Sequence, residues 1–589
     1  MATAGDISDE DFIDFVEEDY RVDENDSGSD VSVSSVDTAD LTDFEEQDND
    51  DVSQEAQVPP NFRVDDSWSE DYTHVGKKKC SQVKGATKDF TNASPYDFFC
   101  SMIPNSYWYA VASETNLYAK QRMKAKGIPE NKMDQEFPPT NSFEIKAYVG
   151  ILMFMNVSPL PSVNLYWSES LPTYNPWVAQ IMPRNRFTQL ASYFHLIDST
   201  KAKPKGQKGY DPLYKVRPLI LLTQQTFAEN YIPSEKITVD EAMIKFKGRC
   251  EILQYLPAKP TKWGIKVWAA CCAETYYMLN FSVYTGKVNE LPDTKEPLGD
   301  RVVKHLIKPY LHKFHTIFFD NYFTSVALLL HLFENKTFAC GTVRNNRRGL
   351  PEEMKSSKCV KKSGDTRRWY KRIGEKTEDD NLEDDEYYHT GNLQAVAWFD
   401  RRKVTVLTTA NDNKDGEAVR YGPGGVVKAR YPKPQAICDY SHGYNGVDKH
   451  DQMRSYYGCQ LKFRKWWKHV FFFCLDTAAV NAYLLYKTVC HGKPISHLMF
   501  QLKIIEGLVN NHKGRKRMGR PILKDQADKR RHLPTKIETA RGKRDCTYCK
   551  TQGRLTVSNH AIQTVYECKK CAVALCKSRG CFGLFHQEE

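Results

Sequence analysis

The chain has 589 residues, which is too many for one hydrophobic core and predicts about three to four domains. Six of its 17 cysteines fall between Cys546 and Cys581, a distribution that excludes a disulfide framework and indicates a reducing compartment with one metal-binding module. The first residues form neither a basic nor an apolar leader, and no run of about 18 residues is free of polar groups. We therefore expect a soluble protein that is not secreted and does not bind a membrane.

The formal net charge of +9 conceals a strong asymmetry. Residues 1–60 hold 21 acidic residues against the single Arg21, a net charge of −20, so residues 61–589 carry +29. A surface of that sign indicates a polyanionic partner, most simply nucleic acid. A general contribution of charge to solubility is the alternative interpretation.

Residues 1–88 are predicted to form an acidic, disordered N-terminal region, which either competes with DNA for the basic surface or serves only as a solvated tail. From residue 89 onward, apolar and aromatic residues recur at helical spacing, for example in Phe143–Met155, so residues 89–234 are predicted to form a helical domain. Arg184 and Arg186 lie just ahead of an amphipathic helix in this domain. Guanidinium and backbone N–H groups there can meet phosphates.

Residues 235–346 alternate between strand-like and helical patterns. Five runs are rich in β-branched and aromatic residues: Lys236–Phe246, Gly264–Ala273, Tyr277–Tyr284, Thr316–Asp320 and Thr337–Val343. Between them, Arg301–Leu311 and Thr324–Asn335 have helical apolar spacing. This order predicts an α/β domain in which ligands bind beyond the strand ends.

The rest of the chain divides by composition. The predicted segments are an insertion domain at residues 347–435, a second part of the α/β domain at 436–456, a second helical part at 457–525 that includes Trp466–Lys487, a basic linker at 526–543 and a Cys-rich domain at 544–589. The fold class is therefore multidomain α/β plus α, with a discontinuous helical domain around the α/β domain and a zinc-binding domain at the C-terminal end.

Four aspartates stand where a soluble core does not favour them. Asp240 and Asp320 end apolar strand-like runs, while Asp448 and Asp451 lie one helical turn apart and so share a helix face. An isolated aspartate of this kind is more often a cap, turn or salt-bridge residue. Carboxylates that converge need cations, however, and such hard oxygen ligands select Mg²⁺ or Mn²⁺, with a pair of ions about 4 Å apart suited to phosphoryl transfer.

Several motifs of the chain resemble those of the piggyBac transposases and the transposable element-derived proteins related to them. They occur in the family's order: PRNRFTQLASYFHL, VDEAMIKFKGR, YLPAKPTKWGIKVW, FFDNYFTS, CGTVRNNRRGLP, GVDKHDQM and a Cys/His-rich end. The resemblance implies an RNase H-like catalytic domain whose metal-binding triad is Asp240, Asp320 and Asp448, with Asp451 as a fourth acid near the site. One departure is Tyr444-Asn445-Gly446, where the family commonly has Met-Gly-Gly, and a lost glycine there puts the turn in doubt.

The resemblance also implies a function. It predicts a cut-and-paste DNA transposase, a DDD/DDE-type endonuclease and strand transferase that works as a homodimer on transposon ends and target DNA, with TTAA target sites and hairpin intermediates. The helical domain would then serve DNA binding and dimerisation, and no small-molecule substrate is expected. The alternative is a domesticated, non-catalytic DNA-binding or chromatin protein that inherited the fold.

Basic residues close to the motifs are the candidate DNA contacts, since Lys and Arg bind phosphates wherever they are exposed. The aromatic residues between them are interpreted as core residues. The candidates are Arg184, Arg186, Lys259, Lys262, Lys266, Arg344, Asn346, Arg347, Arg348, Lys462, Arg464, Lys465 and Lys468.

The C-terminal cysteines have zinc-ligand spacing. Cys546-x2-Cys549 and Cys568-x2-Cys571 are two knuckles that can present their thiolates to one tetrahedral ion. Three further candidates, Cys576, Cys581 and His586, bring the set to seven, one short of two closed sites. His560 is a candidate for the eighth ligand, so one or two Zn²⁺ ions are expected. The family binds transposon-end DNA with this region, although a protein-binding or ubiquitin-ligase finger has the same spacing.

Two basic stretches, Lys513–Pro521 and Lys529–Arg544, precede the cysteines. They suit nuclear import, so a nuclear location is predicted, and simple linker charge is the alternative.

Overall fold

The chain divides into two units, Met1–Gly514 and Arg515–Glu589. One mixed sheet organises the first unit. The computed structural model describes residues 62–75, 78–168, 175–257, 261–286, 296–356, 358–375, 390–410, 412–421, 423–510, 512, 532, 534–538, 542–569 and 571–586. Of the region expected to be acidic and disordered, residues 1–88, the first 61 lie outside these ranges, as do most of the two basic stretches. The expectation was wrong for the part that follows, because β1 (Phe62–Val64) pairs with β10 (Thr366–Glu375) and β2 (Gly85–Ala86) pairs with β3 (Tyr231–Ile232).

The centre of the sheet has the strand order β7-β6-β4-β8-β9. These strands are β4 (Lys236–Lys245), β6 (Trp263–Cys272), β7 (Met278–Val283), β8 (Thr316–Phe319) and β9 (Phe338–Thr342). Strand β8 pairs in parallel with β4 and β9, while β6 is antiparallel to β4 and β7. All five strands were predicted from their β-branched and aromatic residues, and the structure confirms them.

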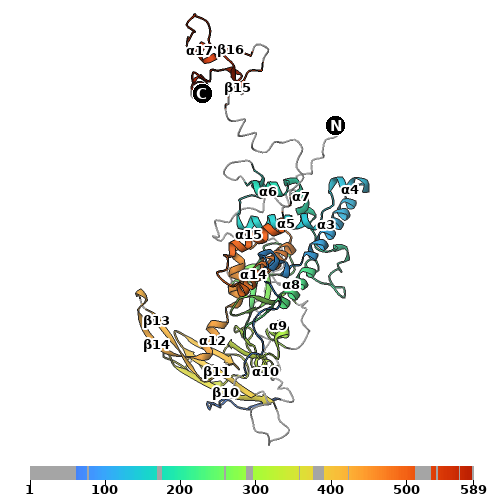
Figure 1. Cartoon of the computed structure of the whole chain (residues 1–589). Coiled ribbons are helices and arrows are strands. Elements are labelled where there is room, and N and C mark those ends of the chain that lie inside the picture. The colour runs from blue at the N-terminus through green and yellow to red at the C-terminus, as the bar shows by residue number, and fades with distance from the viewer. Residues whose placement is uncertain are drawn as a thin grey trace. The chain divides into compact units, whose positions relative to one another are not determined.

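Further strands extend the same sheet beyond β9. They follow in the order β12 (Lys403–Thr408), β11 (Thr390–Phe399), β10 (Thr366–Glu375) and β1 (Phe62–Val64), all antiparallel, and β5 (Leu253–Tyr255) pairs with β6 at the other side. The segment expected as an insertion thus contributes strands to the same sheet. It also forms a hairpin of β13 (Asp415–Tyr421) and β14 (Val427–Pro434) beside α12 (Figure 1).

Helices cover both faces of the sheet because the strands are apolar on both sides. On one face, Ile437 of α12 (Gln435–Gly443) belongs to the same buried cluster as Phe318 of β8. On the other face lie α9 (Leu298–Ile307) and α10 (Val326–Glu334), and Phe319, the next residue of β8, belongs to this main core. The Ser325 hydroxyl caps α10 by accepting a hydrogen bond from the Leu328 N–H at 3.0 Å.

The helical layer combines segments from both ends of the first unit (Figure 1). Phe98 of α2 contacts Tyr486 of α14 and Phe500 of α15, and Gly150 of α5 allows a close approach because a methyl group there would lie 3.1 Å from Val509 of α15. The helices are α2 (Pro95–Met102), α3 (Asn105–Ala125), α4 (Glu130–Glu136), α5 (Ser142–Val157), α6 (Pro176–Ile181), α7 (Arg184–Tyr193), α8 (Arg217–Asn230), α14 (Trp466–Val489) and α15 (His497–Val509).

Helix α14 is the one described helix that is long and apolar enough to cross a membrane by length and composition. However, 89% of its most apolar window is buried inside the protein. It is therefore the central core helix of the helical layer.

The second unit is built around cysteines. Its elements are β15 (Pro534–Lys536), β16 (Arg544–Asp545), α17 (Thr547–Thr551), β17 (Gln563–Thr564), β18 (Tyr566–Cys568), β19 (Val573–Ala574) and α18 (Cys581–Phe585). Strand β15 lies within the segment that we expected to be a basic linker, and it pairs with β18.

Candidate active site and metal centres

Asp240 and Asp320 lie side by side where the parallel pairing of β4 and β8 ends, at the carboxyl end of β8. The register pairs Val239 of β4 with Phe319 of β8, so the two aspartates are the next residues of these neighbouring strands. Asp240 ends the apolar run but lies inside β4, which continues to Lys245 by pairing with β6, as the predicted strand Lys236–Phe246 requires. Asp320 does follow the last residue of its strand.

The helix α13 (Gly446–Tyr457) begins over the same face. A methyl group on Gly446 would lie 2.6 Å from Thr238 Oγ1, and Thr238 shares the face of β4 that carries Asp240 because side chains alternate along a strand. Asp448 stands in the first turn of α13.

The altered turn before α13 does not need the family's glycine. Tyr444 and Asn445 have φ values of −80° and −97°, which ordinary residues adopt. The glycines that matter are those in close contact: Gly446 on Thr238 and Gly443 on Phe318, where a methyl group would approach to 2.7 Å. The Thr238 hydroxyl also donates to the Gly443 carbonyl at 2.6 Å.

Shared neighbours place the acids in one region. The charges of Asp320 and Asp240 both add to burial, the main cause, in raising the pKa of Tyr440. Likewise Asp451 and Asp240 both add to burial in raising the pKa of Cys271. Asp240 thus shares one neighbour with Asp320 and another with Asp451.

Asp320 is the acid with the clearest electrostatic perturbation. Burial raises its pKa, and the Glu241 charge raises it further, whereas the Tyr322 N–H, which donates to Asp320 Oδ1 at 2.9 Å, and the Arg344 charge lower it. The net direction is upward. A carboxylate so placed is poorly compensated by the residues around it.

The carboxylate oxygens of the aspartates are not all within 4.8 Å of one another, as the donor atoms of a preformed metal site would be. Two groups of potential ligands in the described part of the chain have all their donor atoms within 4.8 Å of one another, and both are Cys/His groups of the second unit. Asp240 and Asp320 are partly buried, while Asp448 is exposed. Mutually repelling carboxylates at a strand edge need a counter-charge to approach more closely.

Glu241 points away from the aspartates, as the alternation of β4 predicts, and pairs with Lys266 of β6 at 2.8 Å. Lys266 is 5% exposed and its Nζ lies 3.8 Å from the centroid of the Trp268 ring. We expected Lys266 to contact DNA. The structure instead buries it, since its charge neutralises Glu241 within the core.

Two more expected DNA contacts also make internal contacts. The Arg186 guanidinium binds both Glu144 carboxylate oxygens at 2.8 and 2.7 Å, and it lies inside α7, not ahead of it. Lys468 is 7% exposed and donates to the Ala191 carbonyl at 3.1 Å. These residues join helices of the helical layer.

Arg344 and Arg347 support the turn after Asp320. Arg344 Nε donates to Asn321 Oδ1 at 3.2 Å, and Arg347 Nη2 donates to the Tyr322 carbonyl at 2.8 Å. The loop that follows β9 thus holds the loop that follows β8, at the edge where the aspartates lie.

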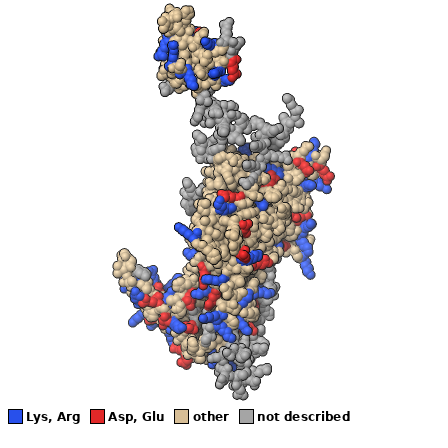
Figure 2. Space-filling view, viewed as in Figure 1, with Lys and Arg blue, Asp and Glu red and all other residues tan. Residues whose placement is uncertain are grey.

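The remaining expected DNA contacts are exposed, except Lys259, which lies outside the described residues. The face of the first unit in Figure 2 shows basic and acidic side chains interspersed, so the basic excess is not gathered in one patch there. The exposed candidates are Arg184, Lys262, Asn346, Arg348, Lys462, Arg464 and Lys465.

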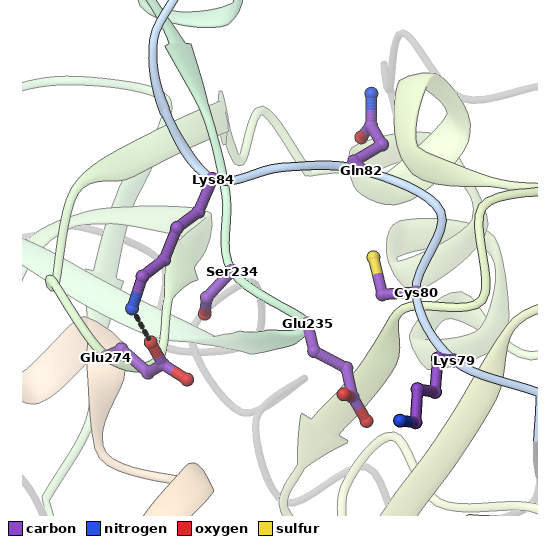
Figure 3. Close-up of a pocket in the computed structure, with 7 residues that line it drawn as sticks. All are labelled: Lys79, Cys80, Gln82, Lys84, Ser234, Glu235 and Glu274. Atoms are coloured by element: carbon purple, nitrogen blue, oxygen red, sulfur yellow. Dashed lines mark hydrogen bonds and ion pairs between the residues drawn. The ribbon is translucent and has the colours of Figure 1, made fainter.

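A pocket of about 340 Å³ lies at the opposite end of β4 (Figure 3). Ser234 and Glu235, which precede β4, line it, and so do Lys84 and Glu274, which pair with each other at 2.7 Å. The aspartates are not among its lining residues.

The second unit brings eight ligands together as two groups. One group is Cys546, Cys549, Cys576 and Cys581, and the other is His532, Cys568, Cys571 and His586. Sulfur separations such as 3.5 Å for Cys549–Cys581 and 4.0 Å for Cys549–Cys576 bracket the edge of about 3.8 Å expected for a tetrahedron around Zn²⁺. The two sequence knuckles therefore belong to different groups, in a cross-braced arrangement.

His532, and not the expected His560, completes the second group of potential ligands. His560 is exposed, whereas His532 Nδ1 lies 3.2 Å from Cys571 Sγ and 3.5 Å from Cys568 Sγ. His586 donates from Nδ1 to the Phe582 carbonyl at 2.7 Å, which leaves Nε2, 3.5 Å from Cys571 Sγ, as its ligand atom. His532 had no sequence signal because it stands alone ahead of the cysteines.

Comparison with known proteins gives the class of protein, because residues 94–483 match the family model described as Transposase IS4. Human (Homo sapiens) piggyBac transposable element-derived protein 3 is 26% identical over 448 residues, 74% of this chain and 68% of the relative. Human piggyBac transposable element-derived protein 5 is 24% identical over 472 residues, 77% of this chain and 83% of the relative.

A solved structure agrees with these sequence matches. A cryo-EM structure of a piggyBac transposase synaptic complex with hairpin DNA superposes with a TM-score of 0.61 and 24% identity, over 84% of this chain and 98% of that one. The chain belongs to the piggyBac-type transposase family.

Proposed function

We propose that this protein is a cut-and-paste DNA transposase whose catalytic centre is the group of carboxylates formed by Asp240, Asp320 and Asp448. The observation that carries the proposal is the register of β4 and β8, which makes two of these aspartates neighbours beneath the helix that bears the third. Acids from two strands and a helix are the arrangement that the resemblance predicts.

The fold around these carboxylates supports an RNase H-like catalytic core. The order β7-β6-β4-β8-β9, with β6 antiparallel and β8 parallel to β4, fits that interpretation. The strands beyond β9 are then the insertion, joined to the core through the pairing of β12 with β9.

The donor set fits Mg²⁺ or Mn²⁺. Burial and the Glu241 charge disfavour ionised Asp320, and a cation held by Asp240, Asp320 and Asp448 would reverse that cost. One cation or a pair would neutralise charge on the scissile phosphate and polarise the attacking oxygen. The chain's own contribution is to orient the acids: Arg344 and Arg347 fix the turn after Asp320, and Gly446 seats α13.

The DNA partner follows from the family and from the basic charge of residues 61–589. The similar solved complex contains hairpin DNA, which supports hairpin intermediates here as well. A homodimer acting on two transposon ends, TTAA target sites and a nuclear location complete the proposal.

The Cys-rich unit is proposed to bind two Zn²⁺ ions through its two ligand groups. Small units of this kind owe their folding to the metal. Its proposed role is to bind transposon-end DNA.

The second candidate is a domesticated, non-catalytic DNA-binding protein. It is favoured by one observation, that the similar human proteins are named as transposable element-derived proteins.

A plasmid excision assay separates the two functions. Wild type should release the element and leave a repaired donor, and Asp320→Asn should reduce this by at least about 1,000-fold, since a metal contributes several kcal/mol to transition-state stabilisation. If neither protein yields repaired donor although both are expressed and bind DNA, the non-catalytic function holds.

A further inference from the structure

Helix α13 carries its acids on one side and a row of anchoring contacts on another. Gly446 sits on Thr238. One turn later the His450 ring is fully buried, with Nδ1 at 2.9 Å from the Tyr276 carbonyl. Another turn later comes Arg454, so the anchors recur every fourth residue along one face.

Arg454 links this anchored face to the acids. Its Nη2 and Nε lie 3.2 and 3.4 Å from Asp451 Oδ1, and the two side chains are only 16% and 27% exposed. The guanidinium also packs on α14, with Cζ at 4.9 Å from the centroid of the Phe473 ring. A charge so enclosed must be compensated by carboxylates close to it.

Helix α14 brings another carboxyl group, that of Asp476, to the region of Arg454. Asp476 is 5% exposed and its Oδ2 accepts from the Cys459 N–H at 2.8 Å. The Arg454 charge favours its ionised form, against the larger effect of burial, which raises the pKa of Asp476 to about 7. Gly458 lets the chain pass tightly here, since a methyl group would lie 3.2 Å from Asp476 Oδ2.

We propose that Arg454 is a positioning residue that ties Asp451, and with it the acidic face of α13, to the core helix α14. Asp451 is then the partner of Arg454 and not a cation ligand. Because Asp448 stands one turn before Asp451 on the same face, the pair fixes the direction in which Asp448 is presented. This inference rests on the proposed function, in which Asp448 helps to hold a divalent cation.

The test measures Mn²⁺ binding by titration calorimetry on the purified full chain, together with its melting temperature. Arg454→Met should weaken Mn²⁺ binding by about 10-fold or more, as loss of a residue that orients a ligand does. Asp451→Asn should have a similar effect, and the double variant should be no worse than either single variant, since both remove the same pair. Arg454→Lys, which keeps the charge, should recover part of the affinity and guards against loss of folding.

Arg217→Met is the matched control. It breaks the Arg217–Asp211 pair of the helical layer, which is 2.6 Å long. The side chains of this pair are 19% and 23% exposed, so they are buried to about the same extent as those of Arg454 and Asp451. It should lower the melting temperature but leave Mn²⁺ affinity within about twofold of wild type.

Two results would overturn this inference and leave the proposed function standing. The first is an Arg454→Met protein that binds Mn²⁺ as tightly as Arg217→Met does. The second is a double variant in which the losses of Mn²⁺ affinity from Asp451→Asn and Arg454→Met add fully, as expected if Asp451 were a ligand. An Asp320→Asn arm identifies failure of the proposed function itself. If Asp320→Asn leaves the Mn²⁺ affinity unchanged, the aspartate site is wrong and both proposals fall.

Discussion

His532 is the residue whose role the structure changes most. It is the fourth potential ligand of the group that contains Cys568, Cys571 and His586, although it lies in a segment whose composition indicates only a basic linker. Its side chain is close to the cysteines because β15, which starts at Pro534, pairs with β18, which ends at Cys568.

The metal content of the second unit tests this assignment. We expect wild type to hold two zinc ions per chain, and His532→Ala to retain about one, because three ligands no longer close the site. His560→Ala should retain both ions. Elemental analysis of the purified proteins measures this, and equal zinc content in wild type and His532→Ala would refute the assignment.

At the scale of elements, the contact between α9 and α10 predicts a pH effect. Burial raises the pKa of Asp300 to about 6 from 3.8, against the lowering effect of the Ser325 hydroxyl, which donates to Asp300 Oδ2 at 2.9 Å. The folded state therefore keeps a proton that the unfolded state releases, so the stability that Asp300 contributes falls as pH rises from about 4 to about 6.

Asp300→Asn cannot ionise and should escape this loss. Its stability relative to wild type should rise by up to about 3 kcal/mol between pH 4 and pH 7, since each pKa unit corresponds to 1.36 kcal/mol. Melting temperatures of both proteins at several pH values measure the difference. The exposed Asp134→Asn serves as the control, and a pH-independent difference for Asp300→Asn would contradict the account.

Most elements could be predicted from the sequence because their signals are local. The strands of the central sheet and α14 follow from β-branched runs and helical apolar spacing. The burial of Lys266 and Lys468 was missed because an amphipathic cation looks the same in sequence whether it is exposed or paired inside. The aspartate group was predictable through the family motifs. The role of Arg454 was not, because its contact with Phe473 joins two helices that the sequence does not pair.

At the scale of the whole molecule, the basic charge should appear as salt-dependent DNA binding. Replacing Lys462, Arg464 and Lys465 together with Gln should reduce the magnitude of the slope of log affinity against log salt by about 2 to 3, if each binds a phosphate. The control replaces the exposed lysines Lys120, Lys124 and Lys132, which removes equal charge outside the candidate contacts. Equal slopes for the two variants would exclude the first group as phosphate contacts.

The central claim is that Asp240, Asp320 and Asp448 hold a divalent cation between two strands and a helix. Anomalous scattering from a crystal grown with Mn²⁺ tests it most directly. We predict a manganese peak within about 2 to 2.3 Å of an oxygen of each aspartate, and no such peak in Asp320→Asn. A well-ordered crystal soaked to saturation that shows no manganese at this edge, or shows it bound by other residues, would contradict the account.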